Sequence, residues 1–412
     1  MVTKLLKRVV PAPLRRPIRG DAPFLIPPLQ RRLTRTWRRS NRLKRGIGRV
    51  RKRLNRLWRK QLKPIRVHIR LLIWNWRRRN RPGEPSDQIH LINPLLNYTG
   101  APLRTLHLYD ELKDRAEVSL WSEHKVPSEI AQKYPVKQIV SGRFEFPDAG
   151  TFVIVSPQSL GPWIRYAHPR RTILVHNSSR LTPREFRRRL RHISKGGRRK
   201  VEIVYASEQT KRSAGNYPGY VEPSLIDIDK FVPASKKSSD SAFAGFIVGR
   251  LSSDLPHKHH PDDAALYQRL VEEGCRIRIM GPSPSLEAEL SGLESVALLP
   301  VDAQEAHLFL QGLDCFFYRT SEEYLEAWGR VVTEAMACGL PVVCHNRGGY
   351  TEIIDHGRNG FLFESQQEAL EVLLLLKEDP ALRERVGREA RRTAEELFSP
   401  ARRSEIVDFY LR

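Results

Sequence analysis

The stretch Glu326-Ala-Trp-Gly-Arg-Val-Val-Thr-Glu-Ala-Met-Ala-Cys-Gly-Leu-Pro-Val-Val343 combines a helix and a strand in a pattern that indicates the fold. Gly329 permits a close turn into a helix that we predict over residues 330–338, and Gly339 and Pro341 are suited to end that helix. The apolar residues that follow are typical of a buried strand. A helix leading directly into such a strand indicates an α/β domain with a parallel sheet.

The beginning of this helix is suited to bind phosphate. Its first N–H groups, near Arg330, Val331 and Val332, have no helical partner and carry partial positive charge. Glu334 lies one turn into the helix, and Glu326 lies in the loop before it. One such carboxylate alone is more often a solvated surface group. Two of them beside a phosphate-binding helix end suit a sugar diphosphate, because carboxylates accept hydrogen bonds from sugar hydroxyls.

Short apolar runs alternate with helical patterns on both sides of this stretch. We predict strands at 88–93, 118–121, 152–156, 172–176 and 202–206, and again at 244–248, 276–280, 315–318 and 342–344. We predict helices at 103–112, 183–193, 261–273, 303–311, 331–337, 367–378 and 400–412. This alternation predicts parallel sheets with helices on both faces.

A segment with several Lys and Ser residues, 233–240, separates the two series of elements. We therefore predict two Rossmann-like domains, over about 87–233 and 241–395, and a C-terminal helix in 396–412 that crosses back over the domain boundary. A chain with two such domains usually binds its ligand in the cleft between them, at the carboxyl ends of the strands.

Nearly all of the net charge lies before these domains. The chain has 412 residues and a net charge of +25. Residues 1–86 hold 28 Lys and Arg residues and two acidic ones, whereas the remaining 326 residues hold 43 basic and 44 acidic ones. Any function that is inferred from charge therefore concerns a basic arm, residues 1–86.

The pattern within the basic arm favours a membrane surface. The proline-rich residues 11–28 predict an extended or disordered segment, 34–61 predict a basic amphipathic helix, and 65–76 predict a second helix. Four of the seven Trp residues lie in the arm. Tryptophan beside arginine suits the headgroup zone of an anionic membrane. Binding to nucleic acid and packing on a partner or on the rest of the chain are the alternatives.

Cysteine usage and hydropathy favour a cytoplasmic protein. The cysteines fall singly in apolar runs without metal-ligand spacing, which predicts reduced, buried thiols; they are Cys275, Cys315, Cys338 and Cys344. No stretch reaches the roughly 18 apolar residues of a membrane span. Residues 1–13 do not show a secretory signal pattern. We expect a cytoplasmic location, with the basic arm at the inner face of the membrane.

Taken together, these motifs resemble those of glycosyltransferase family 4, which has the GT-B fold. The Glu-x7-Glu pattern followed by Ala-Met-Ala-Cys-Gly-Leu-Pro-Val-Val carries the resemblance. Further matches are the Gly-Gly-x-x-Glu of 347–352, the Gly-x-x-Gly turn of 355–363, and the segments 248–252, 207–212 and 225–231. The resemblance covers about 87–395.

The resemblance implies a transferase that uses a nucleotide-sugar donor, retains the anomeric configuration and needs neither metal nor cofactor. It implies that Glu334 holds the ribose of the donor and that Glu326 contacts the transferred sugar. It implies that the N–H groups of Gly329, Arg330, Val331 and Val332 bind the phosphates. Arg250 then neutralises the departing diphosphate, as positive charge placed where negative charge develops.

Three further residues follow from the resemblance. His176 matches a histidine near the reacting sugar, and Gly100 matches a glycine loop near donor and acceptor. The family's phosphate-binding lysine is replaced by Leu255, and we expect Lys258 to take its place from a longer loop. Thr99 stands where the family often has a glycine.

Two other groups of residues could suggest a metal site. The pair Asp262-Asp263 follows Pro261, and we interpret it as a favourable interaction with a helix dipole. The cluster of His257, His259 and His260 is interpreted as part of the same loop. We therefore predict no metal site.

The sequence favours a glycosyltransferase that acts on a glycan or lipid-linked acceptor, in cell-surface polysaccharide or glycolipid synthesis. A non-catalytic GT-B scaffold whose basic arm binds RNA or another polyanion is the alternative, and a nucleotide-sugar epimerase is a third hypothesis. Nucleic acid is not the expected partner. The sugar, the nucleotide and the acceptor stay open.

Overall fold

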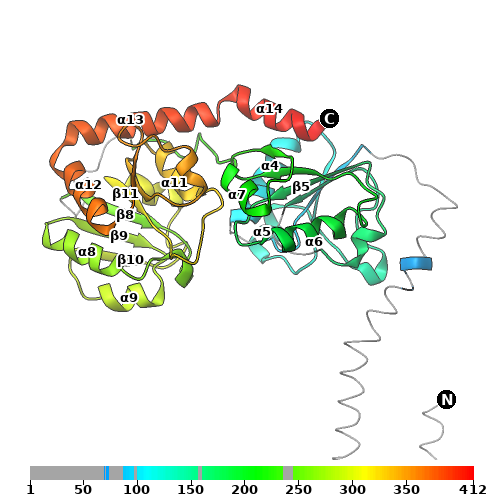
Figure 1. Ribbon diagram of the computed structural model, residues 1–412, viewed down its shortest axis with the longest axis horizontal. Helices are drawn as coiled ribbons and strands as arrows, with labels where there is room; N and C mark the ends of the chain where they lie inside the picture. Colours follow the sequence, from blue (N-terminus) through cyan, green and yellow to red (C-terminus); the bar gives the residue numbers. More distant parts are fainter. Residues whose placement is uncertain (1–68, 70, 74–86, 97–99, 156–159, 235–244) are drawn as a thin grey trace, which may run out of the picture. The chain divides into compact units, whose positions relative to one another are not determined.

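The structure, a computed structural model, describes residues 69, 71–73, 87–96, 100–155, 160–234 and 245–412. Of the basic arm, residues 69 and 71–73 are helical, and the other predictions for residues 1–86 lie outside the described residues. The chain divides into two compact units, Met1–Ile69 and Arg70–Arg412. The second unit contains two parallel β-sheets (Figure 1).

The first sheet has seven strands in the order β3-β2-β1-β4-β5-β6-β7, all of them paired in parallel. Its strands are β1 Ile89–Ile92, β2 Val118–Ser122, β3 Val136–Gln138, β4 Thr151–Val155, β5 Arg171–His176, β6 Glu202–Tyr205 and β7 Tyr220–Val221. The central strands β1, β4 and β5 are mostly apolar and almost entirely buried, because helices cover both faces of such a sheet.

The second sheet has six parallel strands in the order β10-β9-β8-β11-β12-β13. Its strands are β8 Ile247–Leu251, β9 Arg276–Met280, β10 Val296–Leu299, β11 Cys315–Tyr318, β12 Val342–His345 and β13 Phe361–Phe363. Two parallel α/β sheets within one chain confirm the predicted fold class.

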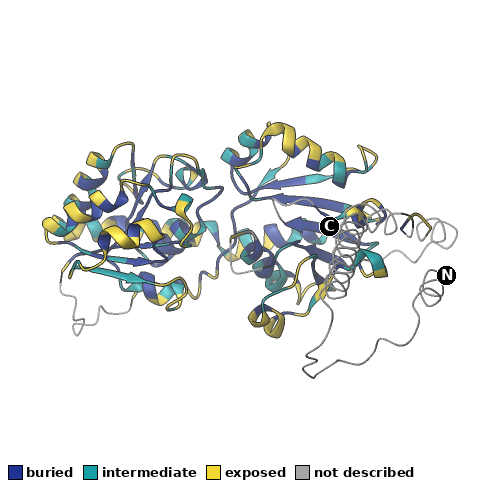
Figure 2. Ribbon diagram, turned by 90° about the horizontal axis from the view of Figure 1, so that it is seen from below, coloured by how far each residue is buried: buried dark blue, intermediate teal, exposed yellow. Residues whose placement is uncertain are grey.

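Helices flank both sheets. In the first series they are α4 Gly100–Leu112, α5 Ser128–Lys133, α6 Pro183–Ile193 and α7 Glu208–Ala214, with short 3-10 turns η2 Ser141–Arg143 and η3 Pro162–Arg165. In the second series they are α8 Asp263–Glu272, α9 Pro284–Leu290, α10 Ala306–Gln311, α11 Arg330–Ala337, α12 Gln366–Glu378, α13 Pro380–Leu397 and α14 Pro400–Leu411, with η4 Pro256–Lys258 and η5 Gly349–Glu352. Figure 2 shows buried strands inside and exposed residues on the outer helix faces.

One predicted strand is displaced. Residues 244–248 were expected to be extended, but β8 is Ile247–Leu251 and continues through Gly249. A Cβ atom at Gly249 would lie 2.3 Å from a side-chain atom of Leu313. Gly249 therefore allows Leu313 to pack against the strand and does not end it.

The strands that sequence reasoning missed are the outer strands of both sheets: β3, β7, β10 and β13. They have two to four residues each. Edge strands are commonly short and partly exposed, so they give little of the apolar signal on which a strand prediction depends.

The last helix contacts the first sheet. Glu222, just after β7, accepts hydrogen bonds at 2.6 Å from Arg104 Nη2 on α4 and at 3.0 Å from the Tyr410 hydroxyl on α14. All three side chains are buried. Phe409 of α14 also stacks on Tyr220 of β7. The C-terminal helix is thus part of the core that surrounds the first sheet.

Two further findings concern sequence predictions. The four cysteines are buried free thiols. Within the described ranges, no helix has both the length and the apolar character that crossing a bilayer requires.

Candidate active site

Gly329 fixes the beginning of α11. Its φ of 82° lies in the left-handed region, and a Cβ atom there would lie 2.6 Å from Cδ1 of Tyr350. Its carbonyl oxygen accepts the N–H of Val332 at 2.9 Å. The prediction that this N–H is open to phosphate is therefore wrong, because the tight turn uses it. The N–H groups of Arg330 and Val331 donate to no acceptor in the described part of the chain.

Replacement of Gly329 by alanine should destabilise the protein by about 1–3 kcal/mol, since alanine is strained at positive φ and its methyl group meets the Tyr350 ring. Urea unfolding measures this change. Gly100→Ala is the matched control, because a Cβ atom there meets nothing within 4 Å. Equal stability of both variants would show that the turn into α11 tolerates a side chain.

Arg330 and Glu334 form an ion pair on the first turn of α11. The Nε atom of Arg330 lies 2.6 Å from Oε1 of Glu334, and both side chains are largely buried. The Nη2 atom of Arg330 lies 3.3 Å from Nε2 of His107 on α4. Burial, and then the Arg330 charge, lower the pKa of His107 to about 4. A neutral imidazole can accept the hydrogen bond that the Arg330 guanidinium donates.

Lys258 and Glu326, which are 68 positions apart in the sequence, meet in a second ion pair. The ammonium of Lys258 lies 2.6 Å from Oε2 of Glu326 and 4.5 Å from the centre of the Tyr324 ring. The Tyr318 hydroxyl donates to Glu326 at 2.8 Å. The Lys258 and Glu326 side chains keep 19% and 12% exposure, so both can meet a ligand.

The charges of this pair are stabilised by their surroundings. Burial raises the pKa of Glu326, but Lys258 and the hydrogen bonds from Tyr318 and Tyr324 together lower it below its ordinary value. Burial lowers the pKa of Lys258, but Glu326, Tyr318 and Tyr324 together raise it above its ordinary value. The pair is therefore charged at neutral pH.

Arg250 lies behind Lys258. It is fully buried, its guanidinium lies 4.8 Å from the centre of the Tyr318 ring, and its Nη2 donates to the backbone carbonyl of Lys258. Its Nη1 lies 3.5 Å from Oδ2 of Asp263, and its Nε has no hydrogen-bond partner within the described ranges. In this conformation a ligand meets Lys258 before it meets Arg250.

Asp263 does more than interact with a helix dipole. It is buried at the first position of α8, where its Oδ1 accepts from Nε of Arg319 at 2.8 Å and its Oδ2 faces Arg250. Arg319 was missed by sequence reasoning. The available signal was its position directly after β11, because β8 and β11 are parallel neighbours and their carboxyl ends meet at one edge.

A cavity of about 650 Å³ adjoins Lys258 and is lined in part by His257, His259, His260 and Ser283. His259 is buried, and its Nε2 lies 3.1 Å from the Ser252 hydroxyl and 3.0 Å from the carbonyl oxygen of Gly281. Across the described residues, no group of three or more His, Cys, Asp or Glu side chains is placed to hold a metal ion.

Residues that follow β5 and β6 contact the loop that carries Glu326. Ser179 donates to the carbonyl oxygen of Leu325, and Ser207 donates to that of Ala327 at 2.7 Å. The Arg180 guanidinium lies 4.5 Å from the centre of the same Tyr324 ring that Lys258 faces. Arg180 is thus a further cation near the Lys258–Glu326 pair. Sequence reasoning missed Arg180, although this residue lies shortly after the predicted strand 172–176.

The structure does not bring His176 or Gly100 into this group of contacts. His176 ends β5 with 0% exposure, and its ring lies 4.6 Å from the centre of the Phe186 ring and 6.0 Å from that of Tyr205. Gly100 is the exposed first residue of α4, and residues 97–99 lie outside the described residues.

His176 should make stability fall in acid. Burial, and then the Arg189 charge, lower its pKa to about 3. The unfolded chain binds a proton at this residue near pH 6.5, whereas the folded chain does not, so acid favours unfolding by up to about 1.4 kcal/mol per pH unit. His176→Phe should remove that part of the slope between about pH 6 and pH 4.

Urea unfolding at several pH values measures this slope. His124→Gln is the control, because it replaces a histidine that is exposed. An unchanged slope in His176→Phe would contradict the assignment of a neutral, buried imidazole.

Comparisons with known proteins identify similar sequences and a similar fold. Residues 248–393 match the family model "Glycosyl transferases group 1". Spore coat protein SA of Bacillus subtilis is 40% identical over 88 residues, which are 21% of this chain and 23% of that protein. D-inositol 3-phosphate glycosyltransferase of Pseudarthrobacter chlorophenolicus is 33% identical over 189 residues, which are 41% of this chain and 44% of that protein.

A solved structure resembles more of the chain. Anabaena HepE in complex with UDP has a TM-score of 0.64 at 17% identity, over 78% of this chain and 99% of that chain, and HepE has also been solved with UDP-glucose. At that identity the likeness shows the fold. The chain spans less than half the length of the curated relatives named above. Residues 248–393 are thus similar in sequence to the glycosyl transferases of group 1, and the similarity in fold extends over most of the chain.

Proposed function

We propose that the protein is a retaining, metal-independent glycosyltransferase that moves a sugar from a nucleotide-sugar donor to a glycan or lipid-linked acceptor. The ion pair of Lys258 and Glu326 carries the proposal. It places a partly exposed cation and a partly exposed carboxylate 2.6 Å apart, near the carboxyl ends of parallel strands. Ligands of open α/β sheets bind at that edge.

Each member of the pair has a role in sugar transfer. The Lys258 ammonium has three N–H donors, of which Glu326 accepts one, so the others can bind the diphosphate that leaves. Lys258 and, behind it, Arg250 supply the positive charge that a divalent ion would otherwise supply. Glu326 accepts hydrogen bonds from hydroxyls of the transferred sugar.

The beginning of α11 completes the donor site. Tyr350 joins it to the Lys258–Glu326 pair, because the Tyr350 ring packs on Gly329 and lies 5.7 Å from the centre of the Tyr318 ring. The free N–H groups of Arg330 and Val331 can bind phosphate oxygens. Glu334 uses Oε1 for Arg330, and its other oxygen can accept a ribose hydroxyl.

The ligands of a protein with a similar fold favour a nucleotide-sugar donor in this proposal, since HepE was solved with UDP and with UDP-glucose. We further propose a role in cell-surface polysaccharide or glycolipid synthesis. In this proposal the basic arm holds the enzyme at the anionic inner face of the membrane, where each Lys or Arg contributes on the order of 1 kcal/mol.

A donor screen tests the function. The full-length protein is heated with UDP-, GDP- and ADP-sugars, and a donor present at 100 times its Kd should stabilise the fold by about 2.7 kcal/mol. Glu334→Gln should weaken this stabilisation. Glu305→Gln is the control, because Glu305 is exposed and pairs only with Lys230 and His307 in the described part of the chain. If no nucleotide-sugar shifts the melting temperature, the proposed function is wrong.

A further inference from the structure

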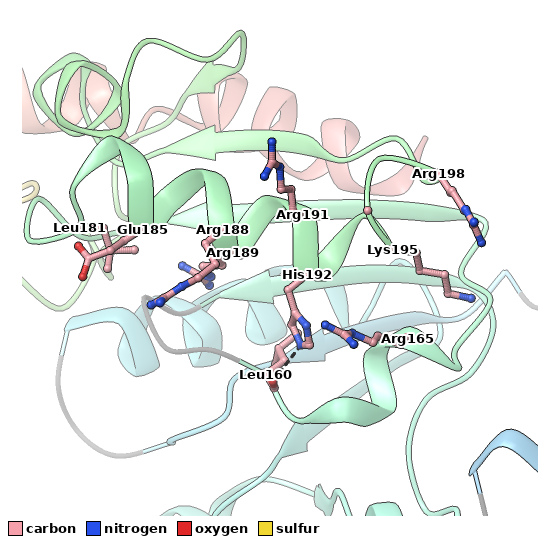
Figure 3. Close-up of a pocket in the computed structure, with 11 residues that line it drawn as sticks. Leu160, Arg165, Leu181, Glu185, Arg188, Arg189, Arg191, His192, Lys195 and Arg198 are labelled. Carbon is pink, nitrogen blue, oxygen red and sulfur yellow. Dashed lines mark hydrogen bonds between the residues drawn. The ribbon is translucent and has the colours of Figure 1, made fainter. Parts of the chain in front are cut away.

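The first sheet carries a second, strongly basic cavity of about 860 Å³, between α6 and the 3-10 turn η3 (Figure 3). Figure 3 shows Arg188, Arg189 and His192 on α6, and Arg165 of η3 pointing toward His192. Its lining cations are Arg165, Arg188, Arg189, Arg191, Lys195 and Arg198, and Glu185 is the acid that lines it.

Arg189 is the unusual member of this set. It keeps 5% exposure, and none of its three guanidinium nitrogens has a hydrogen-bond partner among the residues that the structure describes. Burial lowers its pKa to about 9, so it still bears its charge at neutral pH. A buried, unpaired guanidinium is strongly unfavourable, and a bound anion would supply the missing acceptors.

Four of the other lining cations are open to solvent. Arg165, Arg188, Arg191 and Arg198 are exposed, and none of them forms an ion pair within the described ranges. The Glu185 carboxylate already accepts from the Thr182 N–H at 2.9 Å and from its hydroxyl at 2.8 Å, as part of a helix cap. Its single negative charge faces six lining cations, so the cavity stays strongly positive.

Helix stability alone does not explain this charge. Arg191 and His192 in the last turn of α6 interact favourably with the helix dipole. Arg188 and Arg189 lie further from that end, Arg165 is not on the helix, and like charges three positions apart on a helix repel one another. The arrangement is instead typical of a binding site for a multiply charged anion.

A short segment connects this cavity to the candidate active site. Leu181 lines the cavity, the preceding residue Arg180 stacks on Tyr324, and Ser179 donates to the Leu325 carbonyl. At the other end, Arg189 is near enough to His176, the last residue of β5, to lower its pKa. A ligand held in the cavity is thus bound next to the strand end that contacts the Glu326 loop.

We propose that this cavity binds a phosphate or pyrophosphate group of the sugar acceptor, an inference that rests on the transferase function proposed above. Arg189 binds the anion at the base, and Arg165 and Arg188 bind it at the mouth. Guanidinium groups bind phosphate oxygens in pairs, which favours them over lysine at such a site. The volume exceeds the size of one phosphate and leaves room for a group attached to it.

The test is titration of the full-length protein with inorganic pyrophosphate in a calorimeter. Arg189→Met and the surface variant Arg188→Glu should each raise the Kd at least tenfold, roughly the effect of losing one charged hydrogen bond. Arg184→Glu is the matched control, since Arg184 is exposed on the same helix and does not line the cavity, and its Kd should change less than about twofold. If Arg189→Met does not fold, the pyrophosphate Kd of Arg188→Glu alone tests the proposal.

The donor site could also bind pyrophosphate, and Lys258→Gln separates the two sites. Unchanged binding in Lys258→Gln together with weakened binding in Arg188→Glu supports the cavity. The reverse pattern overturns the proposal. A nucleotide-sugar should still stabilise the Arg188→Glu variant against heat. If nucleotide-sugars stabilise neither this variant nor the wild type, the transferase function is contradicted, whereas the proposal for the cavity is not.

Two probes then identify the source of the phosphate. Displacement of pyrophosphate by glucose 1-phosphate supports a soluble phosphorylated acceptor. Displacement by phosphatidylcholine vesicles that contain phosphatidic acid supports a lipid phosphate, provided that Arg188→Glu abolishes the displacement while the basic arm is intact. If neither probe displaces pyrophosphate from the wild-type protein, the cavity does not take acceptor phosphates and the proposal is wrong.

Discussion

Lys258→Met should lower kcat/KM for sugar transfer by about 10²- to 10³-fold, the usual loss when one preorganised charge that stabilises a transition state is removed. In the proposed function, Lys258 is the cation that a departing diphosphate meets first, because Arg250 lies buried behind it. The loss should appear mainly in kcat, since negative charge on the leaving group grows as the bond to the sugar breaks.

The same variant should change how activity depends on pH. Without Lys258, burial raises the pKa of Glu326, the direction in which burial already acts on this carboxyl. Glu326 then binds a proton at a higher pH than in the wild type, and a protonated carboxyl is a weaker acceptor for sugar hydroxyls. The residual activity of Lys258→Met should therefore fall in acid at a higher pH than wild-type activity does.

Initial rates with the donor found by the thermal screen measure both effects. Lys230→Met is the control, because Lys230 also pairs with a glutamate, Glu305, at 2.7 Å, but both side chains are well exposed. Its rate should match the wild type. A Lys258→Met enzyme with nearly normal kcat would show that another group neutralises the diphosphate.

Arg104→Met should lower the free energy of unfolding by about 3–5 kcal/mol, because it leaves a buried carboxylate without its cation. Arg104 and Glu222 are each 1% exposed and 2.6 Å apart, and Tyr410 donates to the same carboxylate. One hydroxyl cannot replace the guanidinium as a counter-charge for Glu222.

Urea unfolding of Arg104→Met and Arg115→Met makes a matched comparison. Arg115 pairs with Asp408 at 2.6 Å and also joins the first series of elements to α14, but these side chains are 44% and 48% exposed. Its loss should change stability by less than about 1 kcal/mol. The double variant Arg104→Met/Glu222→Met should recover part of the loss, since no buried charge is left unpaired. Similar losses for the two arginine variants would argue that the Arg104 pair is hydrated.

The sequence predicted the central strands and the helix α11 well, because buried parallel strands and glycine-bounded helices leave strong local patterns. Strands β9 and β11 have the predicted bounds. The four edge strands were missed because they are short, and three of them, β3, β7 and β10, are also partly exposed. The displacement of β8 depends on Leu313, a tertiary contact of Gly249 that no local pattern shows.

Some residues of the candidate site could likewise be predicted from the sequence, and others could not. Arg250, Lys258 and Glu326 were proposed from motif resemblance, and the structure brings them together. Arg319 and Arg180 were missed because each depends on which strand ends are neighbours, and Val332 was assigned a free N–H that the tight Gly329 turn uses. The basic cavity combines residues of α6 and η3, and its central feature is the burial of Arg189, which sequence alone does not distinguish from the exposed arginines around it.

The bond between Glu222 and Tyr410 also sets an order for folding during synthesis. The two residues are separated by 188 positions. At about 5–20 residues per second, a ribosome needs roughly 10 to 40 s to make the intervening chain. During that interval the first sheet has all of its strands but not the helix that completes its core. A nascent chain that includes β7 but not yet α14 therefore exposes apolar surface near β7. A chaperone can bind this surface before α14 is synthesised.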